Sequence, residues 1–482
     1  MSWKNALQAF ADKIKSKSSS RDDSNLGSQT QFSGTTKDSQ NKQIVCGLDF
    51  GTAFTKVVLG DDRVRYAVPF RKEVGGVNSY LLPCRYWVDE AGVCSLVREQ
   101  GRQISTLKMR MLDGDFGISL QIELCAFLAL VLKQTRSYFF SEYEATYQKN
   151  YIRWLVNIGL PTSSYHDKKL VSFYKKVVQA AWRVSIQGEP VTFAVCTDML
   201  SKYGDTEQIT EDLQEDMISP FPEFVAQITG YVRSPLRNDD LHFLVDVGAG
   251  TVDATVFNVH QVDGEDLFPI FAKMVEPLGT QHLVENRLAQ AGKSQINGLS
   301  AFENIPRISD FAALLNKDVQ SLKNGDKKLK NSLTSGLVEL LKYTKRRRYP
   351  LSQTWKNGIP TFLCGGGCNC DFYVETILSS KTFGSFKLIP KKLPKPENLK
   401  ADGVESVQYS RLSVAYGLSF DPFDIGEILR MENVEDVFPE EINPNSTSAG
   451  KSASVFCKKC GGTGGLHGFC EACGGSGFEK VQ

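Results

Sequence analysis

The sequence predicts an α/β fold of two related lobes, followed by a small C-terminal cysteine module. Between residues 43 and 430, apolar strand-like runs alternate with amphipathic helical runs, which is typical of α/β organisation. Two stretches within that region share one design, and the last four cysteines are spaced like metal ligands. One strand–helix pair is YIRWLVNIGLP (151–161) followed by HDKKLVSFYKKVVQAAW (166–182).

Composition limits the classes of protein to consider. The chain has 482 residues, enough for two or three domains with well-formed cores. Its formal net charge of +1 argues against non-specific nucleic-acid binding by the whole chain, though not by a local patch. No apolar run approaches the ~18 residues of a membrane helix, and no apolar signal core follows the N-terminus. We therefore expect a cytoplasmic protein without a transmembrane segment.

The chain contains twelve cysteines. Eight are spread through a region large enough to form its own core, and four are at metal-ligand spacing. Without a signal peptide, this usage predicts reduced thiols rather than disulfides. The eight dispersed residues are Cys46, Cys84, Cys94, Cys125, Cys196, Cys364, Cys368 and Cys370.

Residues 1–42 are predicted to form an amphipathic helix on a disordered tether. Trp3, Leu7, Phe10 and Ile14 fall on one helical face of residues 1–17. Residues 18–42 are rich in Ser, Asp and Gln and lack periodicity, so they cannot bury enough apolar area to fold. The helix could pack on its own domain, dock on a partner or bind a membrane surface, although one short face anchors weakly.

An internal repeat predicts the two lobes. VCGLDFGTAFTKVVL (45–59) and FLVDVGAGTVDATVF (243–257) each contain an apolar strand, an Asp, a turn with Gly and Thr, and a second β-rich strand. Two copies about two hundred residues apart indicate two related lobes rather than a solenoid, whose repeats are much closer together.

The repeated turn has the chemistry of a phosphate site. An Asp at the end of a buried strand is costly unless a cation or hydrogen-bond donors satisfy it. Glycines let the backbone turn tightly and bring its N–H groups against phosphate oxygens. Two such turns facing each other across a cleft could hold a triphosphate and a magnesium ion. Either turn alone is a weak signal, because an ordinary hairpin also explains it.

With a third glycine run in TFLCGGGCNCDFY (361–373), the two turns resemble the nucleotide site of the actin, sugar-kinase and heat-shock-protein-70 superfamily. The resemblance covers residues 43–430. It implies duplicated ribonuclease-H-like lobes around a nucleotide cleft, with lobe I at 43–235 and 411–430 and lobe II at 236–410. Three further segments resemble heat-shock proteins: LGTQHLVENRL (278–288), LSVAYGLSF (412–420) and VNIGLPTSSY (156–165).

The resemblance implies roles for individual residues. Asp49 and Asp246 would hold magnesium through its water ligands, and Asp253 would help to orient the same cluster. The first two turns would donate to phosphate oxygens, and the third would pass close to ribose and adenine. The donors are Gly51, Thr52, Gly248, Gly250 and Thr251, and the nucleoside-lining residues are Gly365, Gly366 and Gly367.

Two lysines compete for the γ-phosphate. Lys56 follows the first turn, as in actin, and Lys108 in ISTLKMRMLDGDF resembles a lysine of the heat-shock proteins. Such a lysine would stabilise charge on the transferred phosphoryl group, and a solvated lysine is the alternative at both positions. Glu223 would position the attacking water, and its order after Pro222 resembles plasmid-segregating actins. A glutamate favoured by the dipole at a helix N-terminus is the alternative.

Departures from the family pattern concern the later turns. Ala249 replaces a glycine and is tolerated if its φ is negative. The third turn lacks the Ser-Thr-Arg-Ile-Pro continuation, so the adenine-stacking arginine is missing and nucleotide preference stays open. Cys368 and Cys370 are not expected to bind a second metal, because the backbone there is committed to the nucleotide. The basic run KYTKRRR (342–348) is interpreted as a solvated helix C-terminus, with nucleic acid or an acidic partner as alternatives.

After an acidic and Ser/Pro-containing linker (431–455), residues 456–482 are predicted to form a zinc knuckle. Its C-x2-C-x9-C-x2-C spacing can close a tetrahedral zinc site, and the metal would supply the folding energy. A redox dithiol pair is the alternative, and His467 is a conceivable substitute ligand. The segment resembles the zinc region of J-domain co-chaperones, which implies a docking module for a protein or peptide. The ligands are Cys457, Cys460, Cys470 and Cys473.

Together these features predict a slow Mg-ATP hydrolysing, chaperone-like switch. Lobe closure would be coupled to a client or co-chaperone bound through the zinc knuckle and the N-terminal helix. A filament-forming actin-like ATPase is the main alternative, which Lys56 and the Pro222–Glu223 order favour. A nucleotide-binding pseudo-ATPase is a third hypothesis. A small-molecule kinase is disfavoured, because the sequence offers no convincing Asp base.

Overall fold

The structure, a computed structural model, describes residues 27–161, 167–202, 215–262, 265–294, 305–378, 386–429, 431–434, 454–456 and 478–480. The chain divides into two compact units. The predicted N-terminal helix and the four paired cysteines lie outside the described residues. Unit 1 comprises Met1–Gly230 and Lys395–Pro422, and unit 2 comprises Tyr231–Pro394 and Phe423–Gln482.

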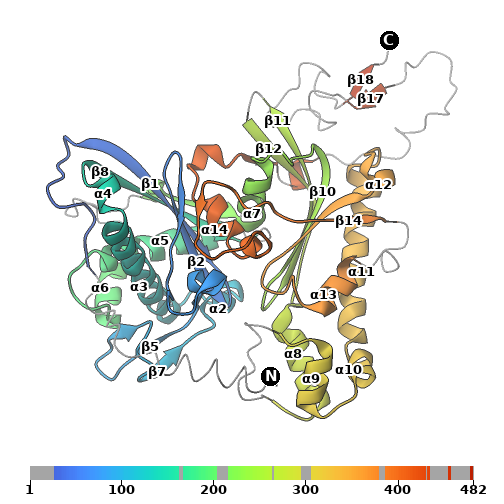
Figure 1. Ribbon diagram of the computed structural model, residues 1–482, viewed down its shortest axis with the longest axis horizontal. Helices are drawn as coiled ribbons and strands as arrows, with labels where there is room; N and C mark the ends of the chain where they lie inside the picture. The colour runs from blue at the N-terminus through green and yellow to red at the C-terminus, as the bar shows by residue number, and fades with distance from the viewer. Residues whose placement is uncertain are drawn as a thin grey trace. The chain divides into compact units, whose positions relative to one another are not determined.

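Unit 1 is built on a mixed sheet in the order β15-β3-β2-β1-β8-β9, with β4 paired to β2 (Figure 1). The first three strands in sequence form an antiparallel meander, and β8 and β9 then run parallel to β1. The strands are β1 (Gln40–Phe50), β2 (Phe54–Gly60), β3 (Arg65–Ala67), β4 (Leu82–Pro83), β8 (Asn150–Leu160), β9 (Ile218–Pro222) and β15 (Leu399–Lys400).

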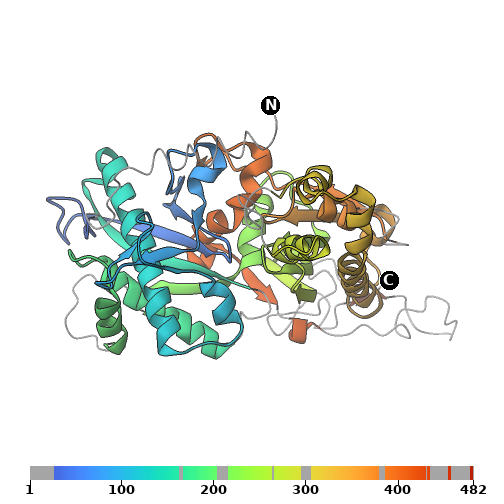
Figure 2. The same cartoon turned by 90° about the horizontal axis from the view of Figure 1, so that it is seen from below.

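Helices cover both faces of this sheet, as Figures 1 and 2 show. On one face, Phe50 of β1 contacts the rings of Phe127 and Tyr174. On the other, Gly47 packs against α14, because a Cβ there would lie 2.4 Å from the Ala415 carbonyl oxygen. Burial on both faces explains why the second half of β1 is continuously apolar up to Asp49. The helices are α3 (Ile118–Glu142), α5 (Lys168–Ser185) and α14 (Ser413–Leu418).

Unit 2 repeats this topology in the order β14-β13-β10-β11-β12-β16. Again three consecutive strands form an antiparallel meander, and the next two run parallel to its first strand. The shared order confirms the predicted duplication, and each unit has the strand order expected for a ribonuclease-H-like lobe. The strands are β10 (Asp240–Val247), β11 (Val252–Val262), β12 (Glu265–Glu276), β13 (Ile359–Cys364), β14 (Leu388–Lys391) and β16 (Glu427–Leu429).

The remaining elements extend each unit. Unit 1 carries a small three-stranded sheet, β6-β5-β7. In unit 2, three short helices share a separate apolar cluster, and the buried Arg287–Asp326 ion pair (2.8 Å) joins two segments of that region. The bounds are β5 (Tyr86–Val88), β6 (Cys94–Ser95), β7 (Arg102–Ile104), α2 (Leu107–Leu112), α4 (Glu144–Tyr147), α6 (Phe193–Ser201), α7 (Glu223–Val232), α8 (Thr280–Gln290), α9 (Ile308–Leu315), α10 (Val319–Gly325), α11 (Lys327–Tyr343), α12 (Thr354–Asn357) and α13 (Asp371–Leu378).

Residues 27–42 of the predicted tether are described and pack on unit 1, which corrects the prediction for this part, whereas residues 18–26 lie outside the described residues. Phe32 is only 3% exposed and packs against the rings of Phe139 and Phe140. The Gln31 amide donates to the Ile152 carbonyl and accepts from its N–H, both at 2.8 Å. The polar composition of this segment did not predict these contacts. One aromatic residue and one amide are enough to hold the segment on the unit, because the folded unit supplies their partners.

Helix α3 is apolar enough to be considered as a membrane span. By length and composition it is the one such helix among the described residues, but 72% of its apolar window is buried inside the structure. It packs against α5, as a core helix does. The eight dispersed cysteines are present as thiols, as predicted.

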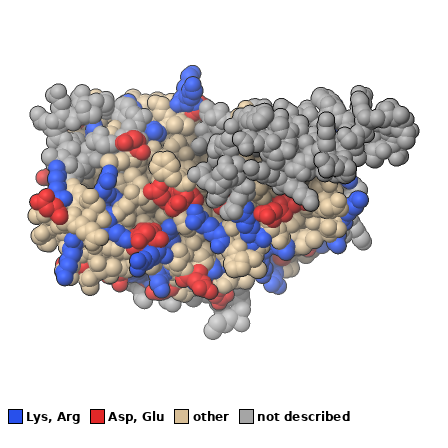
Figure 3. Space-filling model, turned by 90° about the horizontal axis from the view of Figure 1, so that it is seen from above, with Lys and Arg blue, Asp and Glu red and all other residues tan. Residues whose placement is uncertain are grey.

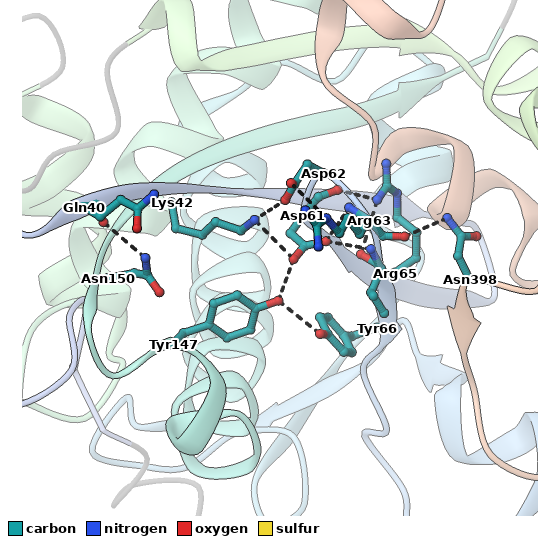
Figure 4. A network of polar contacts seen from close by, with 11 residues as sticks. Gln40, Lys42, Asp61, Asp62, Arg63, Arg65, Tyr66, Tyr147, Asn150 and Asn398 are labelled. Atoms are coloured by element: carbon teal, nitrogen blue, oxygen red, sulfur yellow. Dashed lines mark hydrogen bonds and ion pairs between the residues drawn. The ribbon is translucent and has the colours of Figure 1, made fainter.

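A polar network closes the turn between β2 and β3, at the opposite end of β2 from residues 51–53 (Figure 4). The Asp61 carboxylate accepts from the Val64 N–H at 2.6 Å and from the Tyr147 hydroxyl at 2.8 Å. Burial opposes ionisation of Asp61, but these hydrogen bonds and Lys42 hold its pKa below the ordinary value. The network therefore stabilises the β2–β3 turn. It does not involve residues 51–53, at the opposite end of β2.

His242 is a buried neutral histidine at the start of the unit 2 sheet. Its Nδ1 lies 2.7 Å from the Asp240 carbonyl oxygen, and its Nε2 lies 3.1 Å from the Tyr231 hydroxyl. Nδ1 therefore carries the proton, and Nε2 accepts from Tyr231. Burial lowers the pKa of His242 to about 4, and burial also lowers the pKa of His260 to about 4.

These histidines predict acid sensitivity of unit 2. Between pH 6.5 and 4 the unfolded chain binds protons that the folded unit does not, so the free energy of unfolding falls as pH falls through this window. Because the pKa of His242 is lowered to about 4, the free energy of unfolding falls by about 3 kcal/mol between pH 6.5 and pH 4 through this residue. His242→Gln should flatten the pH dependence, measured by hydrogen exchange of β10 at pH 7 and pH 4.5. The half-exposed His282→Gln is the matched control, and an unchanged slope in His242→Gln would contradict the assignment.

Candidate active site

The first turn, residues 51–53, connects β1 to β2 in unit 1. The Gly51 N–H donates to the Phe54 carbonyl at 3.2 Å and closes the turn. A Cβ on Gly51 would lie 2.6 Å from that same carbonyl oxygen, so the close approach requires glycine. The sequence predicted this tight turn, and the structure places it at the end of a strand buried on both faces.

Asp49 and Lys56 lie directly opposite each other across the β1–β2 hairpin. The Lys56 Nζ is 2.7 Å from the Asp49 carboxylate, and both side chains are largely buried. Lys56 also donates to the Phe54 carbonyl at 3.2 Å. The carboxylate at the end of the buried strand is therefore balanced by a cation seven positions along the chain, which offsets the cost of its burial.

A second ion pair joins Lys108 to Glu223. Lys108 belongs to α2, which follows Thr106 in the left-handed conformation (φ 59). Glu223 is the first residue of α7, immediately after β9. The two side chains meet at 2.6 Å, with Lys108 6% and Glu223 25% exposed. Gly159 leaves room for them, because a Cβ there would lie 2.9 Å from Glu223 Cγ.

Cys84 holds the first turn in place, a role that the sequence did not predict. Its Sγ lies 2.9 Å from the Gly51 carbonyl oxygen and 3.1 Å from the Thr55 hydroxyl, and its N–H donates to Ala53 at 2.9 Å. Burial raises the pKa of this thiol to about 12, despite the nearby lysines. The neutral thiol is therefore a donor to the turn. Cys84 reaches the turn because β4, directly before it, pairs with β2. That pairing joins segments distant in the sequence, so the sequence pattern does not reveal it.

Tyr174 completes the unit 1 cluster. Burial raises the pKa of its hydroxyl, and Glu223, Cys84 and Asp49 lie close enough to raise it further. Among the described residues, this buried hydroxyl has no hydrogen-bond partner. Buried hydroxyls are normally satisfied by protein or water, so its position beside two carboxylates marks a place for a bound polar group.

The second turn repeats the first. The Gly248 N–H donates to the Thr251 carbonyl at 2.9 Å, the same hydrogen bond that closes the Gly51 turn. Asp246 and Asp253 face each other across β10 and β11, in the positions that Asp49 and Lys56 hold in unit 1. The Thr251 hydroxyl donates to Asp253 at 2.9 Å. Each turn thus carries an Asp at the end of its central strand.

Ala249 is accommodated as predicted, because it is not among the described residues with positive φ. The start of α8 braces this turn, which the sequence did not reveal. The Gln281 N–H donates to the Ala249 carbonyl at 2.8 Å, and the Thr280 N–H donates to Gly248 at 3.1 Å. A Cβ on Gly279 would lie 2.4 Å from the Ala249 carbonyl oxygen, which explains the glycine in the LGT sequence.

The third glycine run packs against the second turn. Gly365 has φ +81, and a Cβ there would lie 2.3 Å from the Asp246 carboxylate. The Gly367 N–H donates to the Val247 carbonyl at 2.9 Å. Glycine is therefore required at residue 365 beside Asp246 and at residue 367 beside Val247, where a Cβ would lie 2.4 Å from Val247 Cγ1. The described residues contain no group of three or more His, Cys, Asp or Glu side chains arranged to hold a metal, and this includes the surroundings of Cys368 and Cys370.

The predicted residues thus fall into two half-sites, each within one unit. The proposed zinc ligands Cys457, Cys460, Cys470 and Cys473 lie outside the described residues. The unit 1 half-site contains Asp49, Gly51, Thr52, Lys56, Lys108 and Glu223, and the unit 2 half-site contains Asp246, Gly248, Gly250, Thr251, Asp253, Gly365, Gly366 and Gly367.

Comparison with known proteins gives distant structural neighbours. No family model matches the chain, and no curated protein matches it. MreB 5 of Spiroplasma citri bound to AMPPNP is 14% identical, covering 78% of this chain and 94% of its own, with TM-score 0.41. Apo psk41 ParM is 12% identical (78% and 97% covered, TM-score 0.38). A non-polymerisable quadruple mutant of pCBH ParM is 13% identical (78% and 98%, TM-score 0.39). Similarity at this level decides neither fold nor function, so the fold assignment depends on the repeated sheet topology.

The role of Cys84 gives a prediction. Cys84→Ala leaves the buried Gly51 carbonyl without its thiol donor, so we expect about 1–3 kcal/mol loss in the free energy of unfolding. Cys84→Ser keeps a donor and should lose clearly less, as measured by urea denaturation. In the folded protein, Cys84 should resist iodoacetamide at pH 8, because its thiol is buried and its pKa is raised by burial. Equal destabilisation by Ser and Ala would contradict the hydrogen-bonding role.

Proposed function

We propose that this protein binds Mg-ATP and hydrolyses it slowly to ADP and phosphate. The observation that supports this most strongly is the repeated turn. In each unit, the same backbone hydrogen bond closes a glycine turn beside an Asp at the end of the central strand. An ordinary hairpin explains one such turn, but not two copies at equivalent positions of two sheets of the same topology.

The residues present fit magnesium and phosphate. Carboxylate oxygens suit a hard cation that keeps several of its waters, and Asp49 and Asp246 would hold such waters. Gly365 leaves open the space beside Asp246 that a side chain would fill. The buried Tyr174 hydroxyl accommodates one more polar group. When bound, magnesium would neutralise charge on the phosphate oxygens.

The turns supply the proposed nucleotide contacts. Asp253 would orient the waters around Asp246, and Lys56 would balance Asp49. The backbone N–H groups of the turns would donate to phosphate oxygens, and the third run would line the nucleoside. The phosphate donors are assigned to Thr52, Gly250 and Thr251, because the N–H groups of Gly51 and Gly248 already close their own turns and these two glycines would shape the site. The nucleoside contacts are assigned to Gly365, Gly366 and Gly367.

Glu223 and Lys108 are the proposed catalytic pair, with Asp246 as the acidic partner in unit 2. One oxygen of Glu223 accepts from Lys108, and the carboxylate is partly exposed, so it can also accept from a water molecule. Glu223 would hold the attacking water. Lys108, nearly buried, would stabilise charge on the phosphoryl group, because a cation acts more strongly where solvent is excluded.

Self-association and a chaperone-like switch are the two uses of ATP hydrolysis to compare. We favour self-association over the chaperone-like switch, because Lys56 pairs with Asp49 directly after the first turn and Glu223 follows Pro222, both features that resemble actins. A client-binding switch and a pseudo-ATPase are the competing hypotheses.

The C-terminal segment is proposed to bind one structural zinc in the cytoplasm and to dock a protein or peptide. Strands β17 (Ser454–Phe456) and β18 (Phe478–Lys480) pair antiparallel, with Phe456 opposite Phe478. The residues just before the first cysteine therefore lie beside those that follow the last one. Bringing the two ends together supports a closed module, because it reduces the loop entropy that metal binding must overcome.

Turnover measured against protein concentration tests the ATPase. Glu223→Gln should lower kcat by about 100-fold or more, because a positioned acid–base group contributes at least that much, while nucleotide binding is retained. The exposed Glu90→Gln is the matched control. A threshold concentration above which turnover per molecule rises would support self-association, and concentration-independent turnover would support the switch. Nucleotide binding without turnover would identify a pseudo-ATPase.

Metal analysis of the purified chain tests the knuckle. We expect about one zinc per chain, because four thiolates complete one tetrahedral site. Cys457→Ser and Cys470→Ser should each abolish tight zinc binding, whereas Cys368→Ser should retain it. Zinc that persists in the first two variants, or is lost in the third, would refute the assignment.

A further inference from the structure

The basic run that the proposed function leaves unexplained ends helix α11. The helix continues past Tyr343 as one wider turn, Thr344–Arg348, which we call the basic turn. Arg346 and Arg347 are exposed. Lys345 lies over the rings of Trp355 and Phe386, at 5.9 and 5.7 Å. A cation held over aromatic rings gives the turn a defined orientation rather than a frayed end.

Arg348 joins the basic turn to the end of the unit 2 core. Its Nε donates to the Tyr343 hydroxyl at 3.0 Å, and its Nη1 donates to the Val434 carbonyl. Val434 is buried and belongs to the apolar core of unit 2. Val434, the last described residue before the acidic sequence, therefore lies directly beside the guanidinium of Arg348.

The sequence that begins there is acidic. Residues 435–441 read EDVFPEE, with four carboxylates in seven residues, and we call them the acidic segment. The basic turn carries four cations at residues 345–348. An extended chain covers about 3.3–3.6 Å per residue, so the acidic segment reaches about 25 Å from Val434 at most. All of its carboxylates thus start within reach of the four cations.

The basic turn and the acidic segment both have apolar residues beside their charges. Tyr343 and Leu351, 38% and 43% exposed, are two of the seven large hydrophobic side chains exposed among the described residues. They flank the basic turn in sequence on its two sides. The centre of the acidic segment is Val437-Phe438-Pro439, which supplies apolar surface between its acidic ends.

We propose that the acidic segment docks on the basic turn of the same chain. Tethering at Val434 gives the segment an effective concentration in the millimolar range, an advantage that a separate acidic partner lacks. Exposed ion pairs are individually weak and are screened by salt, so the docking is reversible and salt-dependent. Docking fixes the start of the linker to the cysteine module, and release lengthens its tether. This interaction surface is independent of ATP turnover.

Hydrogen exchange of the full-length chain tests the proposal. In the wild type, amides of residues 435–441 should exchange several-fold more slowly in 20 mM salt than in 500 mM salt. Arg346→Glu with Arg347→Glu, or Glu440→Lys with Glu441→Lys, should each raise the low-salt rate to the high-salt rate. Combining the two reversals should restore slow exchange. Lys327→Glu with Lys328→Glu, exposed at the other end of α11, is the matched control and should change nothing.

Three results would overturn the proposal. The first is salt-independent exchange of residues 435–441 in the wild type, and the second is failure of the combined charge reversal to restore slow exchange. The third is loss of binding to a fluorescent single-stranded oligonucleotide on reversing Arg346 and Arg347, with exchange of the acidic segment unchanged. That third result would assign the basic turn to nucleic acid. Both arginines are exposed, so their reversal leaves the core of unit 2 intact.

Discussion

Asp49 lies at the end of a strand that is buried on both faces, and its charge must be compensated there. Lys56 does so from the opposite strand of the hairpin, at 2.7 Å. The turn between them is shaped around this pair, because Gly51 passes too close to the Phe54 carbonyl to carry a side chain and Cys84 donates to the Gly51 carbonyl. The second ion pair, Lys108–Glu223, is assembled beside this hairpin from elements that follow it in the chain.

Unit 2 uses the same hairpin with a different balance of charge. Asp253 stands where unit 1 has Lys56, so two carboxylates face each other across β10 and β11. The Thr251 hydroxyl donates to Asp253, and the start of α8 braces the carbonyl groups of the turn. Unit 1 therefore places a cation opposite its strand-end Asp, whereas unit 2 places a second carboxylate opposite Asp246.

On the face shown in Figure 3, basic and acidic side chains are interspersed, which agrees with the net charge of +1. The basic turn and the acidic segment are local exceptions in the sequence, and Arg348 of the basic turn donates to the carbonyl of Val434, the residue before the acidic segment. This contact between Arg348 and Val434 is visible only in the fold, because the two residues are 86 positions apart in the sequence.

The sequence by itself determined the features that depend on neighbours along the chain. The two hairpins and the Asp at each strand end follow from apolar strand runs joined by turns of Gly and Thr, all of which are adjacent in the sequence. The sequence left Lys56 as a γ-phosphate ligand or a solvated lysine, and the structure pairs it with Asp49. Tertiary structure alone decided the contacts between distant segments. Lys108 meets Glu223 across 115 positions, Cys84 reaches back to Gly51, and Phe32 is buried against α3 although its surroundings in sequence are polar. Such contacts depend on how the helices and sheets pack, and a local pattern of residue types does not encode which distant partner a side chain meets.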